Sequence, residues 1–217
     1  MLEYRVYQRI KETGQDNYFL DNECEIEPDF LYLGYVYEAV SMIVPKSYKI
    51  LDLGCYMCAQ AFLFERFKEY IGVDSYDIGE NPDGTKVPRR FKTLNSTMIS
   101  ESIEDFLKSN KCQDGKVYVI MSAVPCKADT AEKVISSFKN VTVNYPGKEG
   151  IYKGIYADEI QKITEKITSA YCPFSQKYLN SHPSEVWKQA KIELNTYKEI
   201  REIINAVKTQ QSEEKND

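Results

Sequence analysis

The sequence predicts an α/β protein with a doubly wound, mostly parallel sheet and helical additions at both ends. Continuous apolar runs occur at 50–53 and 70–73, with a helix-like segment between them. Runs of this kind are typical of parallel strands that are buried on both faces. The first run breaks at Gly54 and the second closes on Asp74, an order typical of the first half of a nucleotide-binding sheet.

The chain of 217 residues divides into three predicted regions. Residues 1–28 form an N-terminal helix and covering segment, 29–146 the α/β core, and 147–217 a helical C-terminal extension. The contents of hydrophobic residues, 42%, and of charged residues, 28%, are those of a globular protein.

The core should begin with a helix from Phe30 to about Val44, which Asp29 caps and Pro45 ends. This helix is apolar on nearly every side, so we expect it to lie against the sheet. The first strand is followed by a helix-like segment from Ala59 to Tyr70, and the second strand begins at Tyr70. Turn-forming residues fill 75–88, and no full second crossover helix is predicted there.

The remaining core elements are shorter. A third strand is expected at 91–94, a helix at 100–108, a fourth strand at 117–121, a helix from Asp129 or Thr130 to Phe138, and a fifth strand at 141–143. Residues 148–156 are predicted to be a connection, with no antiparallel pair of further strands. Helices follow at 158–169 and from Ser184 onward, and residues 210–217 should fray.

The segment ILDLGC at 50–55 and the segment YIGVD at 70–74 resemble motifs I and II of the class I S-adenosylmethionine-dependent methyltransferases. The resemblance implies a Rossmann-like fold with S-adenosylmethionine as cofactor. Asp52, Gly54 and Cys55 would form the turn under the methionine part of the cofactor. Asp74, with Ser75 beside it, would hold the ribose. The family's adenine contacts follow the third strand, which by position implies Ser96, Thr97 and Met98.

The chain departs from the family pattern at two positions. Tyr56 and Cys58 stand where the family has its second and third glycines, which allow backbone to approach the cofactor. This departure keeps a second hypothesis open, in which a non-catalytic descendant uses the fold as a binding or scaffold module. Another nucleotide-using enzyme is a third hypothesis, and its nicotinamide form has the least support.

The catalytic residue and the methyl acceptor are not identified by the sequence. Pro125-Cys126 matches the nucleophile dipeptide of the cytosine C5 methyltransferases, which makes Cys126 a weak candidate. A turn after a buried strand explains the same dipeptide. The acceptor could be a small molecule or a macromolecule. The formal net charge of −5 disfavours nucleic acid, although a local basic patch could serve a structured RNA.

The cysteines and termini predict a cytoplasmic protein. The chain lacks a signal peptide pattern and an apolar run of the ~18 residues that a membrane span needs. Cys55 and Cys58 form a C-x-x-C pair, which suggests zinc binding, redox chemistry or small side chains that fill a tight turn. Because His182 is the only histidine, we predict no metal site. The long C-terminal helix either packs on its own domain, recognises a substrate or pairs with a second chain as a homodimer.

Overall fold

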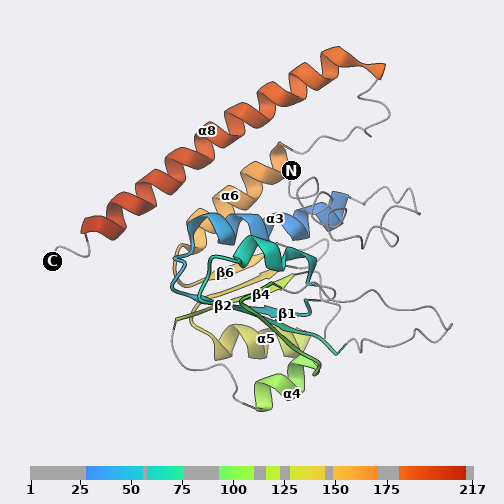
Figure 1. Cartoon of the computed structure of the whole chain (residues 1–217), viewed down its shortest axis with the longest axis vertical. Helices are drawn as coiled ribbons and strands as arrows, with labels where there is room; N and C mark the ends of the chain where they lie inside the picture. Colours follow the sequence, from blue (N-terminus) through green and yellow to red (C-terminus); the bar gives the residue numbers. More distant parts are fainter. Residues whose placement is uncertain are drawn as a thin grey trace.

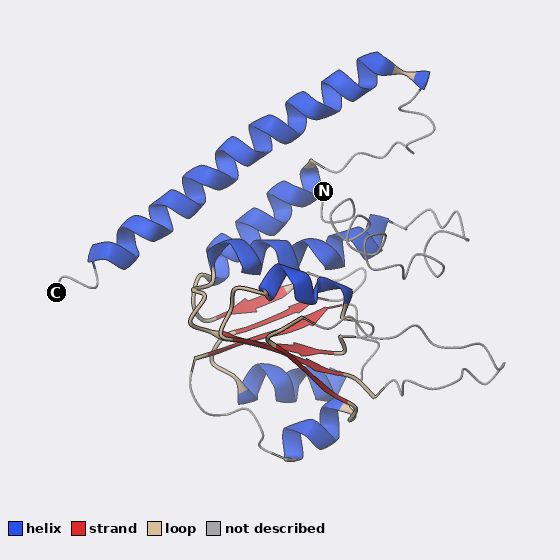
Figure 2. Ribbon diagram, viewed as in Figure 1, coloured by secondary structure: helices blue, strands red, loops and turns tan. Residues whose placement is uncertain are grey.

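The structure is a computed structural model that describes residues 28–55, 58–75, 93–109, 116–122, 128–144, 149–170 and 181–213. Within these residues the chain forms a six-stranded sheet between two layers of helices (Figures 1 and 2). The predicted N-terminal helix and covering segment lies outside the described residues, as does most of the predicted turn region at 75–88.

The sheet has the strand order β3-β2-β1-β4-β5-β6, in which the first five strands are parallel and β6 is antiparallel to β5. The strands are β1 Lys49–Leu53, β2 Glu69–Val73, β3 Ser96–Ile99, β4 Val117–Ser122, β5 Val141–Asn144 and β6 Ile151–Lys153. This order confirms the predicted α/β class with a mostly parallel sheet. The order reverses between β1 and β4, which is the position at which open α/β sheets bind ligands.

Helices cover both faces of the sheet (Figure 1). One face carries α3 Pro28–Ile43, the 3₁₀ helix η1 Ala59–Phe64, α6 Ala157–Ser169 and α8 Pro183–Glu213, and the other carries α4 Ile103–Lys108 and α5 Ala128–Ser137. Alternate strand residues point to alternate faces. Ile50 and Tyr70 therefore belong to the core under α3 and α6, whereas Leu51 and Ile71 belong to the core over α4 and α5.

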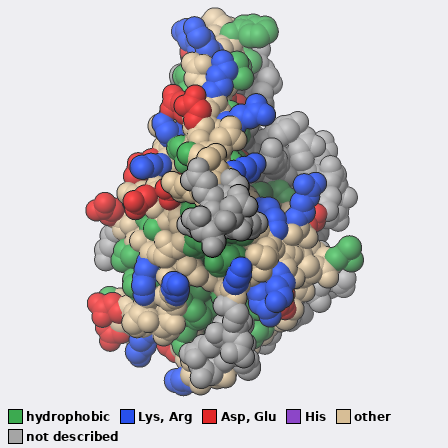
Figure 3. All heavy atoms as spheres, turned by 90° about the vertical axis from the view of Figure 1, so that its left-hand side faces the viewer, with side chains coloured by type: hydrophobic (Ala, Val, Ile, Leu, Met, Phe, Trp, Pro, Cys, Tyr) green, Lys and Arg blue, Asp and Glu red, His purple; other side chains and the backbone are tan. Residues whose placement is uncertain are grey.

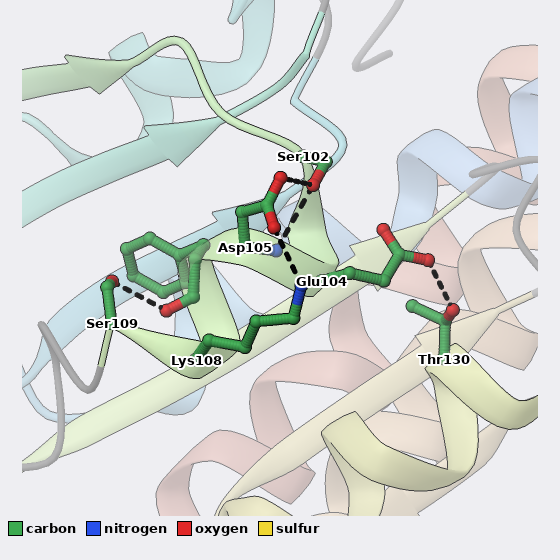
Figure 4. Close-up of polar contacts among 7 residues, drawn as sticks. Ser102, Glu104, Asp105, Lys108, Ser109 and Thr130 are labelled. Atoms are coloured by element: carbon green, nitrogen blue, oxygen red, sulfur yellow. Dashed lines mark hydrogen bonds and ion pairs between the residues drawn. The ribbon is translucent and has the colours of Figure 1, made fainter.

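The short helix α4 is held in place by side chains at its first turn (Figure 4). The Ser102 hydroxyl accepts a hydrogen bond from the backbone N–H of Asp105 at 3.1 Å, which caps the helix. The Asp105 carboxylate accepts hydrogen bonds from Ser102 at 2.8 Å and from Lys108 at 2.9 Å. Thr130 donates to Glu104 at 2.5 Å and so ties α5 to α4.

The third strand lies later in the chain than predicted. Residues 94 and 95 form a turn, and β3 begins at Ser96, so the expectation of a strand reaching Leu94 was wrong. The turn is anchored by the Asn95 amide, which donates to the carbonyls of Phe64 at 2.9 Å and Phe67 at 3.0 Å. These hydrogen bonds hold the turn against the segment that precedes β2, so β3 begins only at the next residue, Ser96.

The segment after the first strand is also shorter than its pattern suggested. The helix-like segment from Ala59 is a 3₁₀ helix that ends at Phe64. Its N-cap residue Cys58 has a left-handed backbone, with φ 59°. After the helix, the N–H of Lys68 bonds to the carbonyl of Lys46 at 2.8 Å, and this contact turns the chain into β2.

The region predicted as a connection at 148–156 contains the edge strand β6, so that expectation was wrong. Gly154 follows β6 with φ 94°, and a Cβ there would overlap the carbonyl of Lys139. The amide oxygen of Asn140 accepts from the N–H of Ile155 at 3.0 Å. These contacts bind the end of β6 to the start of β5 and direct the chain into α6.

The last helix, α8, begins at Pro183, before the predicted Ser184 cap. The carbonyl of His182 accepts from the N–H of Glu185 at 2.9 Å and starts the helical bonding. The helix continues to Glu213 through residues that were expected to fray. Ile200 and Val207, in its C-terminal half, are buried in the core shared with α3 and α6.

Candidate functional site

The carboxyl ends of β1 and β2 lie side by side. Leu53 pairs with Val73, and the N–H of Gly54 then donates to the Val73 carbonyl at 2.7 Å. Gly54 has φ 76°, a conformation that glycine adopts without the steric cost of a Cβ. The chain therefore bends away from the sheet directly after β1, at the edge where ligands bind in such sheets.

Asp52 is fully buried, with an exposed fraction of 0%. Tyr37 donates to one carboxylate oxygen at 2.8 Å, Gln60 donates to the other at 2.5 Å, and Tyr70 donates to the same oxygen as Gln60. The three donors come from α3, η1 and β2. The Asp52 carboxylate therefore joins three elements under the turn, and its contact with a cofactor would be indirect.

Burial raises the pKa of Asp52 from its ordinary 3.8 to about 6, although the hydrogen bonds from Tyr70, Gln60 and Tyr37 lower it. The nearby charge of Asp74 makes a smaller contribution to this rise. Burial and then the charge of Asp52 raise the pKa of Tyr37 and that of Tyr70 well above the ordinary tyrosine value. Both phenols therefore remain protonated donors at neutral pH.

Three sulfur atoms meet beside this carboxylate. Cys58 Sγ lies 3.1 Å from Cys55 Sγ and 3.0 Å from Met98 Sδ, and both cysteines are buried thiols outside any disulfide. They occupy the space above Gly72, where a Cβ would lie 2.8 Å from each thiol sulfur. The hydrogen bond with Cys58, and then burial, raises the pKa of the Cys55 thiol. A protonated, buried thiol is a poor nucleophile and fits a packing role.

Asp74 and Ser75 follow β2 at the same edge as Gly54. The N–H of Asp74 donates to the Ile99 carbonyl at 3.1 Å, which fixes its backbone between β2 and β3. Asp74 is partly buried and Ser75 is exposed. An acid at the end of β2 is the residue that the resemblance assigns to the ribose, and the structure places it one strand away from the Gly54 turn.

Ser96 and Thr97 lie at the opposite end of the sheet. They begin β3 and pair with Tyr70 and Ile71, near the start of β2. The Ser96 hydroxyl donates to the Thr93 carbonyl at 2.9 Å, and Thr97 donates to Glu69 at 3.2 Å. Their proposed contact with adenine depended on a third strand ending at residue 94, so the shift of β3 removes its basis.

The residues that follow β3 at the ligand-binding edge are Ser100 and Glu101 instead. The sequence did not point to them, because no apolar run marks where β3 ends. Tyr56 and Cys126, which bear on the cofactor turn and on catalysis, lie outside the described residues.

A second polar residue that the sequence analysis missed is Asn144, the last residue of β5. Its side chain is buried, and neither amide atom has a hydrogen-bond partner among the described residues. Asn144 pairs in register with Ser122 at the end of β4. Both follow Tyr118 and Thr142 on the face that α3 covers, since alternate residues share a face. The sequence feature that could have indicated Asn144 is a polar residue directly after the run Val141-Thr142-Val143.

Comparisons of the chain with protein-family models, with curated proteins and with solved structures give no match. The assignment of a function therefore depends on the strand order and on the side chains at the carboxyl edge of the sheet. In the described part of the chain, no three His, Cys, Asp or Glu residues gather as a metal site. The described helices also include none with the length and apolar character of a membrane span.

Proposed function

We propose that this chain is a Rossmann-like, S-adenosylmethionine-dependent methyltransferase-like protein. The observation that carries the proposal is the bend at Gly54 after β1, with Asp74 at the end of the neighbouring parallel strand. The bend would let the backbone approach a cofactor closely, and the carboxylate of Asp74 could accept hydrogen bonds from ribose hydroxyls. Both occur beside the reversal of strand order, where sheets of this class bind ligands.

The side chains at this edge would divide the work of binding. The turn at Gly54 and Cys55 would pass under the methionine part, and Asp74 would accept hydrogen bonds from the ribose. Asp52 acts through the turn, because its oxygens are occupied by Tyr37, Gln60 and Tyr70. Methyl transfer requires mainly that the acceptor atom be aligned at about 3 Å from the sulfonium methyl group, which positioning residues supply.

The test is a thermal melt with and without S-adenosylmethionine and S-adenosylhomocysteine. A ligand at about 100 times its Kd stabilises the folded state by about 2.7 kcal/mol, which raises Tm by several degrees. We expect both ligands to raise Tm, and we expect Asp74→Ala to lose the shift. Asp158→Ala is the matched control, because Asp158 is exposed in the first turn of α6. An unchanged Tm with both ligands would exclude the cofactor.

A binding or scaffold module is the second candidate, and a specific observation favours it. The sulfur atoms of Cys55 and Cys58 fill the space above Gly72, and both oxygens of Asp52 already accept hydrogen bonds from protein side chains. A turn packed in this way is stable without a ligand. Isothermal titration with S-adenosylhomocysteine separates the two candidates, since the module should release no heat of binding.

A further inference from the structure

The helix α8 has an outer face that its own domain does not cover. Trp187 is 77% exposed and Leu194 is 56% exposed, and they lie seven residues apart, on one side of the helix. Ile200 and Val207 face the core shared with α3 and α6. With 3.6 residues per turn, Trp187 lies roughly 140° around the helix from Ile200. The exposed tryptophan therefore points away from the body of the protein.

Basic side chains follow the same direction. Four exposed bases lie within about 60° of Trp187 around the helix: Lys191, Lys198, Arg201 and Lys208. From Lys191 to Lys208 this row is about 26 Å long. We call Trp187, Leu194 and these four bases the basic outer face. In Figure 3, the N-terminal half of α8 forms the narrow upper end of the molecule, where basic and hydrophobic surfaces lie next to each other.

The acids of α8 mostly point elsewhere. Glu199 forms an ion pair with Lys166 of α6, and Glu185, roughly 160° around the helix from Trp187, forms one with Lys188 at 2.6 Å. Glu193 is partly buried and accepts from Gln189 at 3.2 Å. Along the described side chains of residues 183–210, Glu202 is the acid that shares the outer face. Charge is thus separated across one helix, although the whole chain carries −5.

We propose that the basic outer face binds single-stranded nucleic acid. The four bases would contact phosphates, of which a stacked strand carries one per rise of about 3.4 Å along its axis, and the exposed ring of Trp187 would stack on a base. The net charge of −5 disfavours nucleic acid for the chain as a whole, but this face carries four bases and one acid. Binding of a strand to this face does not depend on binding of the cofactor. If the bound strand is also taken as the methyl acceptor, that step rests on the proposed function.

An anionic membrane is the competing occupant, and the arrangement of apolar residues disfavours it. Insertion at a membrane surface needs a broad apolar face. The other large apolar residues of α8 that are exposed, Val186 and Ile192, lie roughly 100° and 140° around the helix from Trp187, in opposite directions. The outer face thus offers one large aromatic ring and one leucine among four bases, which suits stacking and phosphate contact.

Trp187 is the only tryptophan of the chain, so its fluorescence reports on this face directly. The probes are a mixed-sequence 20-nucleotide strand, as DNA and as RNA, and vesicles containing phosphatidylserine. We expect either strand to quench the fluorescence, and we expect the logarithm of the affinity to fall with the logarithm of salt concentration with a slope of up to about −2.8 for four phosphate contacts. Trp187→Ala should weaken binding, measured by anisotropy of a labelled strand, roughly five-fold or more.

The matched variants carry three charge reversals each, which lower the formal net charge from −5 to −11 in both cases. Reversal of Lys191, Lys198 and Arg201 to Glu should weaken binding at least ~10-fold and reduce the salt slope to about −0.7. Reversal of the exposed Lys68, Lys133 and Lys139 to Glu should have a smaller effect. Circular dichroism checks that both variants fold.

Three results would overturn the proposal. The first is a tryptophan signal that neither strand changes. The second is an equal loss of affinity in the two triple variants, which would mean that only the net charge matters. The third is a blue shift with the vesicles while both strands leave the fluorescence unchanged, which would assign the face to an anionic membrane. Loss of cofactor binding would leave each of these readouts unaffected, so the two proposals fail separately.

Discussion

At the scale of single residues, Asp52 links the local chemistry of the turn to the stability of the fold. Its folded pKa of about 6 lies above its ordinary value, so the folded state favours the protonated carboxyl. The contribution of this group to stability is therefore fully present below about pH 3.8 and is lost as pH rises through about 6. Above that pH, the donors Tyr37, Gln60 and Tyr70 offset the cost of a buried charge.

Tyr70→Phe removes one of these donors. We expect the pKa of Asp52 to rise above about 6, because the Tyr70 hydrogen bond lowers it. The free energy of unfolding at pH 7 should fall by about 1.5–3 kcal/mol, the usual range for a hydrogen bond to a charged group. The loss should shrink at pH 4, where the carboxyl is protonated. Urea unfolding at both pH values and a ¹³C NMR titration of Asp52 measure the two effects.

Tyr118→Phe is the control for this variant. Tyr118 is buried on the same face of the sheet, and its hydroxyl bonds to Thr142 at 2.7 Å. Because both groups are neutral, its loss should cost about 1 kcal/mol at either pH and leave the Asp52 titration in place. If Tyr70→Phe showed this same pH-independent loss, the charge of Asp52 would not be the reason for the contact.

Gly72→Ala tests the sulfur cluster. The new Cβ would lie 2.8 Å from the sulfurs of Cys55 and Cys58 and 3.0 Å from that of Met98. Overpacking of this kind costs about 1–3 kcal/mol. Cys58→Ala removes one of the obstructing atoms, so the double variant should lose less stability than the two single losses predict. A double-mutant cycle by urea unfolding measures this coupling, and additive losses would contradict the assigned packing.

The sequence could predict which residues end the first two strands, but not what their side chains contact. Asp52, Gly54 and Asp74 lie at strand ends as the pattern indicated. The partners of Asp52 could not be predicted, because Tyr37 lies 15 residues before it and Tyr70 lies 18 residues after it. Contacts of this kind depend on how helix and strand pack, and residue order does not determine that for a single chain.

At the scale of elements, buried strands were predicted more accurately than exposed ones. The central strands β1, β4 and β5 were predicted to within one residue, because each is a continuous buried run. The edge strands differ. β3 and β6 are mostly exposed or half-buried, so their side chains lack the apolar pattern that marks a strand. Backbone pairing with β2 and β5 makes them strands, and a single sequence does not display that pairing.

The cap of α4 is a test at this scale. Ser102→Ala removes the acceptor of the Asp105 N–H, and α4 has only six residues. We expect a loss of about 1 kcal/mol in the free energy of unfolding, with faster amide exchange in the first turn of α4. Ser136→Ala is the control, since Ser136 is exposed on α5 and donates only to the carbonyl three residues before it. Equal losses in the two variants would exclude a specific capping role.

At the scale of the whole molecule, the long helix α8 takes one of the roles that its sequence left open, because it packs on its own domain. Its C-terminal half packs on α6 and α3 through Ile200 and Val207, whereas its N-terminal half exposes Trp187 and Leu194. The sequence showed a broad apolar face but could not show where the domain stops covering it. α6 ends at Ser169, and the Gln189 amide of α8 donates to the carbonyl of the next residue, Ala170, at 2.7 Å.

This division predicts that truncations in the two halves of α8 will differ. Ile200→Ala should lower the free energy of unfolding by about 2–4 kcal/mol, because Ile200 is 2% exposed and its loss leaves a cavity against α6 and α3. Leu194→Ala, a truncation of similar size six residues earlier, should change it by no more than about 0.5 kcal/mol. Urea unfolding with matched m-values measures both. Similar losses would mean that the N-terminal half is also covered, and the outer face would then not be available to a partner.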